Sequence, residues 1–173
     1  MSSSFAPELI QRAEVSSEHH QPLPHFPEIS KAPVKMVFCC FDPRVKPEEF
    51  LELTDADRAF LIRTASGSPA RNIGDIVAID TLLGVAEVIV IKHTDCGATH
   101  QTNDDVRNHI LEYNPELVGK LDDFPLVAAP DISKQGQEDI ELIKSSPYLR
   151  KELRDTASGL LYDIDTGKLT RIA

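Results

Sequence analysis

The chain alternates between short apolar runs and segments in which apolar residues recur every three or four positions. Residues 36–41, 59–62 and 88–91 are apolar runs without polar alternation, a pattern typical of strands covered on both faces in a parallel sheet. Residues 47–53 and 73–83 lie between these runs and show helical spacing. The order strand, helix, strand, helix, strand predicts an α/β domain with a parallel-sheet core and helices on both faces.

The remainder of the chain predicts two more helices and a hairpin. Thr102 and Asp105 form a capping-box pattern, which predicts a helix that ends before Pro115. A second helix is expected over residues 137–145. Residues 159–172 hold two short stretches on either side of an Asp-Thr-Gly turn, and this pattern predicts a C-terminal hairpin.

Residues 1–33 differ from the rest, because serine and proline interrupt any regular element there. We expect an N-terminal arm over 1–33 and a single domain over 34–173. Residues 7–15 could form a short helix with apolar residues on one side. So short a helix is marginal in water alone. It either docks on another surface, such as that of a partner subunit, or frays as a tail.

Composition narrows the class of protein. The 173 residues, 41% of them hydrophobic, suit one globular domain. The net charge of -10, from 28 acidic and 18 basic residues, offers no basic surface for nucleic acid or an anionic membrane. No apolar stretch approaches the ~20 residues needed to cross a bilayer, and no secretory or organelle signal is evident. We expect a cytoplasmic protein with neither nucleic acid nor membrane partners.

Candidate metal ligands follow two of the apolar runs. Cys40 lies at the end of the first run, next to its last residue Phe41, while His93 and Cys96 follow the third. The carboxyl ends of neighbouring parallel strands share one edge of a sheet, so these residues converge if the two strands are neighbours. Zinc takes thiolate and imidazole ligands, and a catalytic zinc site uses three protein ligands while leaving a fourth position open. The pattern predicts one Zn²⁺ ion per chain.

Each of these residues taken alone would be more typical of a protein core, and only the three together favour a metal. Cys39 is expected in the core, because cysteine is among the most buried residue types. Three cysteines are too few and odd in number for a disulfide scaffold. His100 and His109 are expected on the surface, with a role in proton transfer as the less favoured alternative.

Asp42 and Arg44 lie two positions apart, so in an extended segment their side chains point the same way. A guanidinium binds a carboxylate through two hydrogen bonds. An ordinary ion pair on a loop is the alternative. Their place beside Cys40 favours a catalytic dyad, in which Arg44 holds Asp42 so that it accepts a hydrogen bond from a zinc-bound water.

The motifs C-x-D-x-R and H-x-x-C, in a small acidic α/β chain, resemble the β-class carbonic anhydrases. The likeness extends over residues 34–97, over 137–147 and over the closing Leu-Tyr-Asp-Ile-Asp-Thr-Gly-Lys-Leu. The resemblance implies reversible hydration of carbon dioxide to bicarbonate and a proton by zinc-bound hydroxide. It also implies a homodimer or a dimer of dimers, built partly by N-terminal helices.

For the site, the resemblance implies Cys40, His93 and Cys96 as zinc ligands, with Asp42 and Arg44 as the catalytic dyad. In some members of the family the aspartate itself takes the fourth metal position, so Asp42 is also a candidate ligand. If Asp42 closes the site in this way, activity should rise toward alkaline pH as water replaces it.

One segment departs from the family pattern. The family commonly has Arg-Asn-Ala-Gly after its second strand, whereas this chain has Arg63-Thr64-Ala65-Ser66-Gly67. Residues 71–74, Arg-Asn-Ile-Gly, look closer but begin a helical pattern, so Arg63 is the residue we align. We expect this departure to affect the turnover rate and the detailed shape of the active site, but not the metal ligands.

Two alternatives remain open at this point. One is a related hydrolase of carbonyl sulfide or carbon disulfide, which share the linear shape and electrophilic carbon of carbon dioxide. The other is a non-catalytic protein in which zinc stabilises the fold. A permanently zinc-bound Asp42 would favour the second.

Overall fold

A computed structural model describes residues 5–23, 25, 32–122, 124, 126 and 128–173. The chain divides into two units, Met1–Lys31 and Ala32–Ala173, and each is described by itself. In the first unit, α1 (Ala6–Ser17) begins with a proline in its first turn and buries none of its residues. The predicted helix over 7–15 is therefore present and extends slightly further at both ends.

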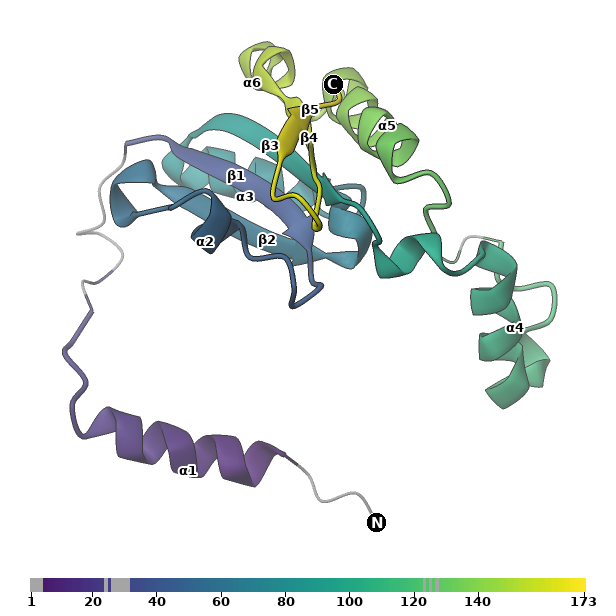
Figure 1. Cartoon of the computed structure of the whole chain (residues 1–173), viewed down its shortest axis with the longest axis horizontal. Coiled ribbons are helices and arrows are strands. Elements are labelled where there is room, and N and C mark those ends of the chain that lie inside the picture. Colours follow the sequence, from purple (N-terminus) through teal and green to yellow (C-terminus); the bar gives the residue numbers. More distant parts are fainter. Residues whose placement is uncertain (1–4, 24, 26–31, 123, 125, 127) are drawn as a thin grey trace. The chain divides into compact units, whose positions relative to one another are not determined.

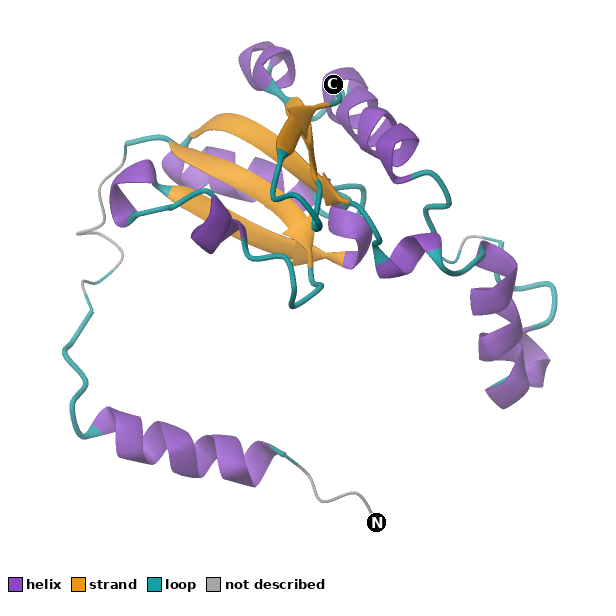
Figure 2. Cartoon of the chain, in the orientation of Figure 1, coloured by secondary structure: helices purple, strands orange, loops and turns teal. Residues whose placement is uncertain are grey.

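The second unit is built on one sheet, which the described strands form in the order β2-β1-β3-β4-β5 (Figures 1 and 2). The strands are β1 (Val34–Cys40), β2 (Ala59–Thr64), β3 (Val85–His93), β4 (Ser158–Tyr162) and β5 (Leu169–Arg171). The pairs β1–β2, β1–β3 and β3–β4 are parallel, and β4–β5 is antiparallel. The predicted α/β class and the C-terminal hairpin are confirmed.

Helices lie on both faces of this sheet, but they cover the two faces unequally. The helices of the second unit are α2 (Pro47–Phe50), α3 (Ile73–Leu83), α4 (Asn103–Tyr113), α5 (Ile132–Ser145) and α6 (Lys151–Thr156). Residues of α3, α5 and α6 pack with Met36, Phe38 and Val90 in the larger core. On the opposite face, Phe50 at the end of α2 packs against a smaller cluster. That cluster contains Cys39, which is buried as predicted.

Two helix boundaries differ from the predicted ones. The helix expected over 47–53 ends at Phe50, because Glu52 adopts a left-handed conformation with φ of 50°. The helix expected over 137–145 begins earlier, at Ile132, because the side chain of Asp131 accepts a hydrogen bond from the Lys134 amide. The predicted capping box is present at the start of α4, between Thr102 and Asp105.

Among the described residues, no helix combines the length and the apolar character that a membrane crossing requires.

Candidate metal centre

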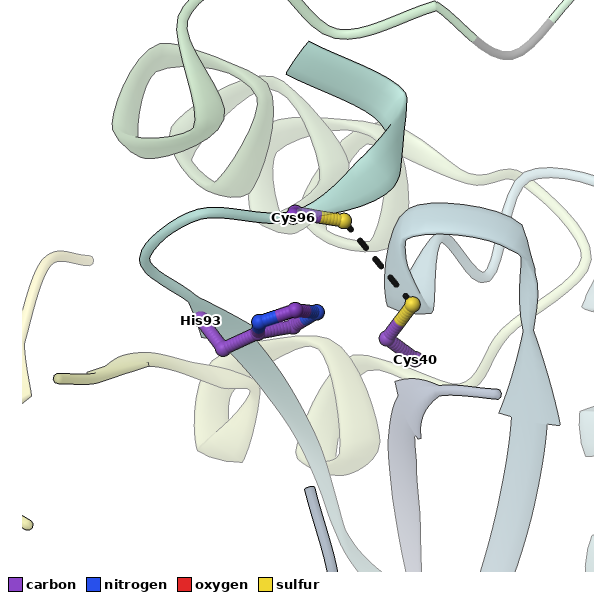
Figure 3. Close-up of side chains that lie close together, drawn as sticks. All are labelled: Cys40, His93 and Cys96. Atoms are coloured by element: carbon purple, nitrogen blue, oxygen red, sulfur yellow. Dashed lines mark hydrogen bonds between the residues drawn. The ribbon is translucent and has the colours of Figure 1, made fainter. Parts of the chain in front are cut away.

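Sheet topology brings the three predicted ligands together. Strands β1 and β3 are hydrogen-bonded neighbours, so their carboxyl ends lie side by side. Cys40 is the last residue of β1, His93 is the last residue of β3, and Cys96 lies in the turn that follows β3. Their ligand atoms all lie within 4.8 Å of one another, and all three residues are buried (Figure 3).

The spacing of the two sulfur atoms fits a metal site. Sγ of Cys40 lies 3.8 Å from Sγ of Cys96, too far for a disulfide. Tetrahedral zinc with Zn–S bonds of about 2.3 Å would place two thiolate sulfurs about 3.8 Å apart.

His93 completes this donor set. Its Nδ1 lies 2.9 Å from the carbonyl oxygen of Thr94, which orients the ring and leaves Nε2 free of a proton when Nδ1–H donates. Nε2 is buried and has no hydrogen-bond partner within the described part of the chain. Such an orphaned acceptor is rare in protein interiors, and a metal ion explains it. The donor set therefore fits zinc.

Without a metal, the two thiols titrate together. A hydrogen bond from the Cys96 thiol lowers the pKa of Cys40, against the opposing effect of burial. Donating that bond raises the pKa of Cys96, and burial raises it more. One thiolate therefore forms readily, whereas the second requires a cation to replace its proton.

The turn that carries Cys96 is fixed by the C-terminal hairpin. The amide of Thr94 donates to the carbonyl oxygen of Tyr162 at 2.9 Å, and its hydroxyl oxygen accepts the amide of Ile164 at 3.0 Å. Beyond the turn, the carbonyl oxygen of Cys96 accepts hydrogen bonds from Thr99. Sequence reasoning missed Thr94, because its partners depend on how β3 and β4 align.

Asp42 and Arg44 form the predicted bidentate pair. The Arg44 Nε lies 3.0 Å from Oδ1 of Asp42, and Nη2 lies 2.7 Å from Oδ2. The Arg44 amide also donates to Oδ1. These hydrogen bonds from Arg44 hold the pKa of Asp42 at about 2, despite the opposing effect of partial burial. Asp42 is therefore ionised at neutral pH.

Arg44 also joins the two motifs, through a residue that sequence reasoning did not single out. Its Nη1 donates to a carboxylate oxygen of Asp95 at 2.8 Å, and its Nη2 donates to the carbonyl oxygen of Asp95 at 2.9 Å. The other carboxylate oxygen of Asp95 lies 2.8 Å from Nε2 of His100. In the sequence, only the position of Asp95 within the H-x-x-C motif could have pointed to a role for it near the site. His100 and His109 are exposed, as predicted.

Arg63 supports the segment around the first ligand. Its Nη1 donates to the carbonyl oxygens of Cys40 and Val45, at 3.0 and 2.7 Å. Its Nη2 lies 3.2 Å from a carboxylate oxygen of Glu48. Arg63 corresponds to the arginine of the family's Arg-Asn-Ala-Gly pattern. Its hydrogen bonds hold the segment that carries Cys40, Asp42 and Arg44.

A pocket opens onto these groups. It has a volume of about 550 Å³, and both cysteines and the dyad line it. Ala65 and Ser66, in the segment that departs from the family pattern, form part of its wall. Gln101 lies on its lining as well. A small molecule in this pocket would meet the exposed side of the metal site and the Asp42 carboxylate together.

Comparison with protein families identifies the chain. Residues 35–169 match the family model described as carbonic anhydrase. The chain belongs to the β-carbonic anhydrase family. Beta-carbonic anhydrase 1 of Mycobacterium tuberculosis is 26% identical over 165 residues, which cover 95% of this chain and 94% of that protein. The carbon disulfide hydrolase of Saccharolobus solfataricus is 28% identical over 159 residues, covering 78% of this chain and 75% of that one.

Solved structures of β-carbonic anhydrase relatives share the fold. The carbonic anhydrase of Streptococcus mutans superposes with a TM-score of 0.74 at 28% identity and covers 100% of both chains. The carbonic anhydrase of Glaciozyma antarctica superposes with a TM-score of 0.75 at 27% identity and covers 98% of this chain and 99% of its own. The aligned part is thus nearly the full length of both chains in each comparison.

Proposed function

We propose that this chain is a zinc-dependent carbonic anhydrase, which interconverts carbon dioxide and bicarbonate with release or uptake of a proton. The observation that carries the proposal is the buried Cys40, His93 and Cys96 cluster, which opens into a pocket lined by Asp42 and Arg44. The zinc stoichiometry is one ion per chain, since the cluster supplies one set of three protein donors.

When bound by these donors, zinc would lower the pKa of a water molecule and so supply a nucleophile near neutral pH. The protein residues do the rest. With zinc bound, the thiolates of Cys40 and Cys96 would neutralise the formal charge of the ion, which would weaken this acidification relative to three neutral imidazoles. The pocket provides space for a linear substrate beside the open side of the site.

Asp42 is placed to accept a hydrogen bond in this pocket. Its side chain is 12% exposed and ionised. The carboxylate can therefore accept a hydrogen bond without first losing a proton of its own. Arg44 fixes the orientation of the carboxylate by contacting both of its oxygens. The same contacts support an open metal site, because they hold the carboxylate on the guanidinium. That Asp42 is also a fourth ligand in a closed state stays a prediction.

Hydrolysis of carbon disulfide or carbonyl sulfide is the second candidate function. It is supported by the similarity to carbon disulfide hydrolases, at 28% identity in one case. These two substrates and carbon dioxide would all use the same metal centre and nucleophile. All three are linear molecules with an electrophilic carbon, so access to the pocket decides which of them reacts.

The proposal is tested on zinc-loaded protein with matched assays. Stopped-flow measurement of carbon dioxide hydration should give rapid, zinc-dependent turnover, whereas hydrolysis of carbon disulfide and carbonyl sulfide should be much slower. The reverse order of rates would select the hydrolase. Zinc at one ion per chain with none of these activities would select the non-catalytic alternative.

We also propose a homodimer or a dimer of dimers in the cytoplasm. The oligomer is supported by α1, which leaves the apolar side chains of Leu9, Ile10 and Val15 exposed within its own unit. The compartment is supported by the three free cysteines, which suit a reducing environment. The overall charge of -10 supports the absence of nucleic acid or membrane partners.

A further inference from the structure

A buried ion pair lies one residue from the metal centre and takes no part in the site described above. Lys92 precedes His93 on β3, and its side chain is 0% exposed. Its Nζ lies 2.5 Å from Oδ2 of Asp139 on α5, whose side chain is 3% exposed. A lysine is almost never fully buried unless it has a partner, so this pair is a specific feature of the interior.

The pair makes hydrogen bonds to the turn that follows β2. Lys92 Nζ donates to the carbonyl oxygen of Ser66 at 2.8 Å. The hydroxyl of Ser68 donates to Oδ1 of Asp139 at 2.7 Å. The turn over 65–68 is thus held at two points, one by the ammonium and one by the carboxylate.

This turn adopts a conformation that needs support. Ser66 and Gly67 are consecutive left-handed residues, with φ of 53° and 67°. For a serine this conformation is unfavourable, because its Cβ crowds the neighbouring carbonyl oxygen. The turn also lies against the strand that carries the first ligand, since a Cβ on Gly67 would be only 3.1 Å from the amide nitrogen of Cys40. Any shift of the turn would therefore alter the pocket wall that Ser66 forms beside the cysteines.

The interior accommodates the lysine at a specific place. A Cβ on Gly136 would lie 3.1 Å from Cγ of Lys92, so the glycine leaves room for the lysine stem beneath α5. Core stability alone does not explain the charges, because apolar residues of similar volume often replace a buried ion pair without loss. What apolar residues could not supply is a hydrogen bond to the Ser66 carbonyl.

We propose that Lys92 is a positioning residue, whose Asp139-bound ammonium holds the 65–68 turn in place as a wall of the metal pocket. The effect of Lys92 on the turn is independent of the reaction. Its effect on turnover rests on the proposed carbonic anhydrase function.

The test replaces both charges together, as Lys92→Met with Asp139→Leu, so that no unpaired charge remains in the core. Amide hydrogen exchange is measured on the zinc-loaded protein by mass spectrometry of peptides that span residues 64–70. We expect exchange in this peptide to rise by about tenfold or more, with little change in β1 and β3, because the turn loses both anchors. Lys134→Met is the matched control, because Lys134 is an exposed lysine on α5, the helix that carries Asp139. This variant should leave exchange of the 64–70 peptide unchanged.

Kinetics supply a second readout that a purely structural role would not move. In the zinc-loaded double variant, kcat for carbon dioxide hydration should fall by about tenfold, while the melting temperature and zinc content stay close to wild type, because a displaced wall misaligns the reacting groups. Wild-type exchange in the 64–70 peptide of the folded double variant would overturn the proposal. So would faster exchange together with an unchanged kcat and KM.

Two further controls keep the outcomes distinct. If the double variant does not fold, Ser68→Ala removes the bond to Asp139, together with the hydrogen bond that the Ala70 amide donates to the same hydroxyl. Exchange of the same peptide should then rise by about threefold, and unchanged exchange in that variant would overturn the proposal. If the wild-type protein lacks carbon dioxide hydration activity, the proposed function fails. Amide exchange then still decides whether Lys92 holds the turn.

Discussion

Arg44 contacts both carboxylate oxygens of Asp42 and, with the same guanidinium, the side chain and backbone of Asp95. Asp42 follows β1 and Asp95 follows β3, so this arginine joins the two segments that supply the metal ligands. Its position makes Arg44 a link between the arrangement of the proposed ligands and the orientation of the Asp42 carboxylate, for which we propose a catalytic role.

Asp42→Asn tests the role of that carboxylate. The variant keeps the three protein donors, so zinc should remain at one ion per chain, while kcat should fall by about 10²-fold, a typical loss for a missing proton acceptor. Asp95→Asn is the matched control, since Asp95 also binds Arg44 but is 52% exposed, and its effect should be much smaller. Stopped-flow assays and metal analysis give both values. Full turnover in Asp42→Asn would remove Asp42 from the mechanism.

Cys96→Ser should lose the metal. A serine hydroxyl is a poor zinc ligand, whereas a thiolate is a strong one, so zinc content should fall far below one ion per chain after dialysis. Cys39→Ala serves as the control, because Cys39 is buried beside Cys40 but lies in the apolar cluster on the opposite side of the sheet. That variant should retain stoichiometric zinc. Retention by Cys96→Ser instead would show that the ligand assignment is wrong.

Gly67→Ala should destabilise the fold by about 2 kcal/mol or more. Gly67 has φ of 67°, and an added Cβ would lie 2.9 Å from the carbonyl oxygen of Ile91, a backbone atom that cannot easily move. Gly167→Ala has a similar φ of 70° but meets no atom within 4 Å, so it should cost only about 1 kcal/mol. Urea unfolding of the two variants separates the effect of crowding from that of backbone strain. Equal losses of stability would contradict this account.

Asp80→Asn should lower stability by about 1 kcal/mol at neutral pH. Burial raises the pKa of Asp80, but hydrogen bonds from Arg150 and the Val85 amide lower it more, so the net pKa lies below its ordinary value. The carboxylate therefore stabilises the folded state fully above the unfolded pKa of about 4. This contribution is lost as pH falls through the lower folded pKa. The difference in unfolding free energy between wild type and Asp80→Asn should accordingly be largest at neutral pH and shrink below about pH 4.

Replacing Leu9 and Ile10 by aspartate should reduce the molecular mass in solution, as measured by light scattering coupled to size-exclusion chromatography. Both side chains are exposed on α1, at 48% and 61%, and charges there would oppose burial against a partner subunit. Gln11→Asp adds a charge to the same helix at a polar position and should leave the mass unchanged. A double variant of wild-type mass would show that α1 does not hold the oligomer together.

Local patterns in the sequence predicted strands better than helix ends. The apolar runs over 36–41, 59–62 and 88–91 all lie in sheet strands apart from Phe41. Strand β1 is covered on both faces, as a continuous apolar run predicts, whereas the edge strand β2 leaves Phe60 exposed. The start of α5 was missed, because its glycine at position 136 weakens a helical pattern when read alone. In the fold, that glycine is needed for the close approach of Ile172 and Lys92.

Short motifs predicted the Cys40, His93 and Cys96 ligand set, the Asp42 and Arg44 pair and the family, because C-x-D-x-R and H-x-x-C each hold their residue types at short, fixed spacings. The folded chain alone shows that Asp95 also binds Arg44 and that Lys92 pairs with Asp139, 47 positions away. Such partners depend on which strands are neighbours and on where a helix crosses the sheet. Packing of the whole chain sets both, and no local pattern records them.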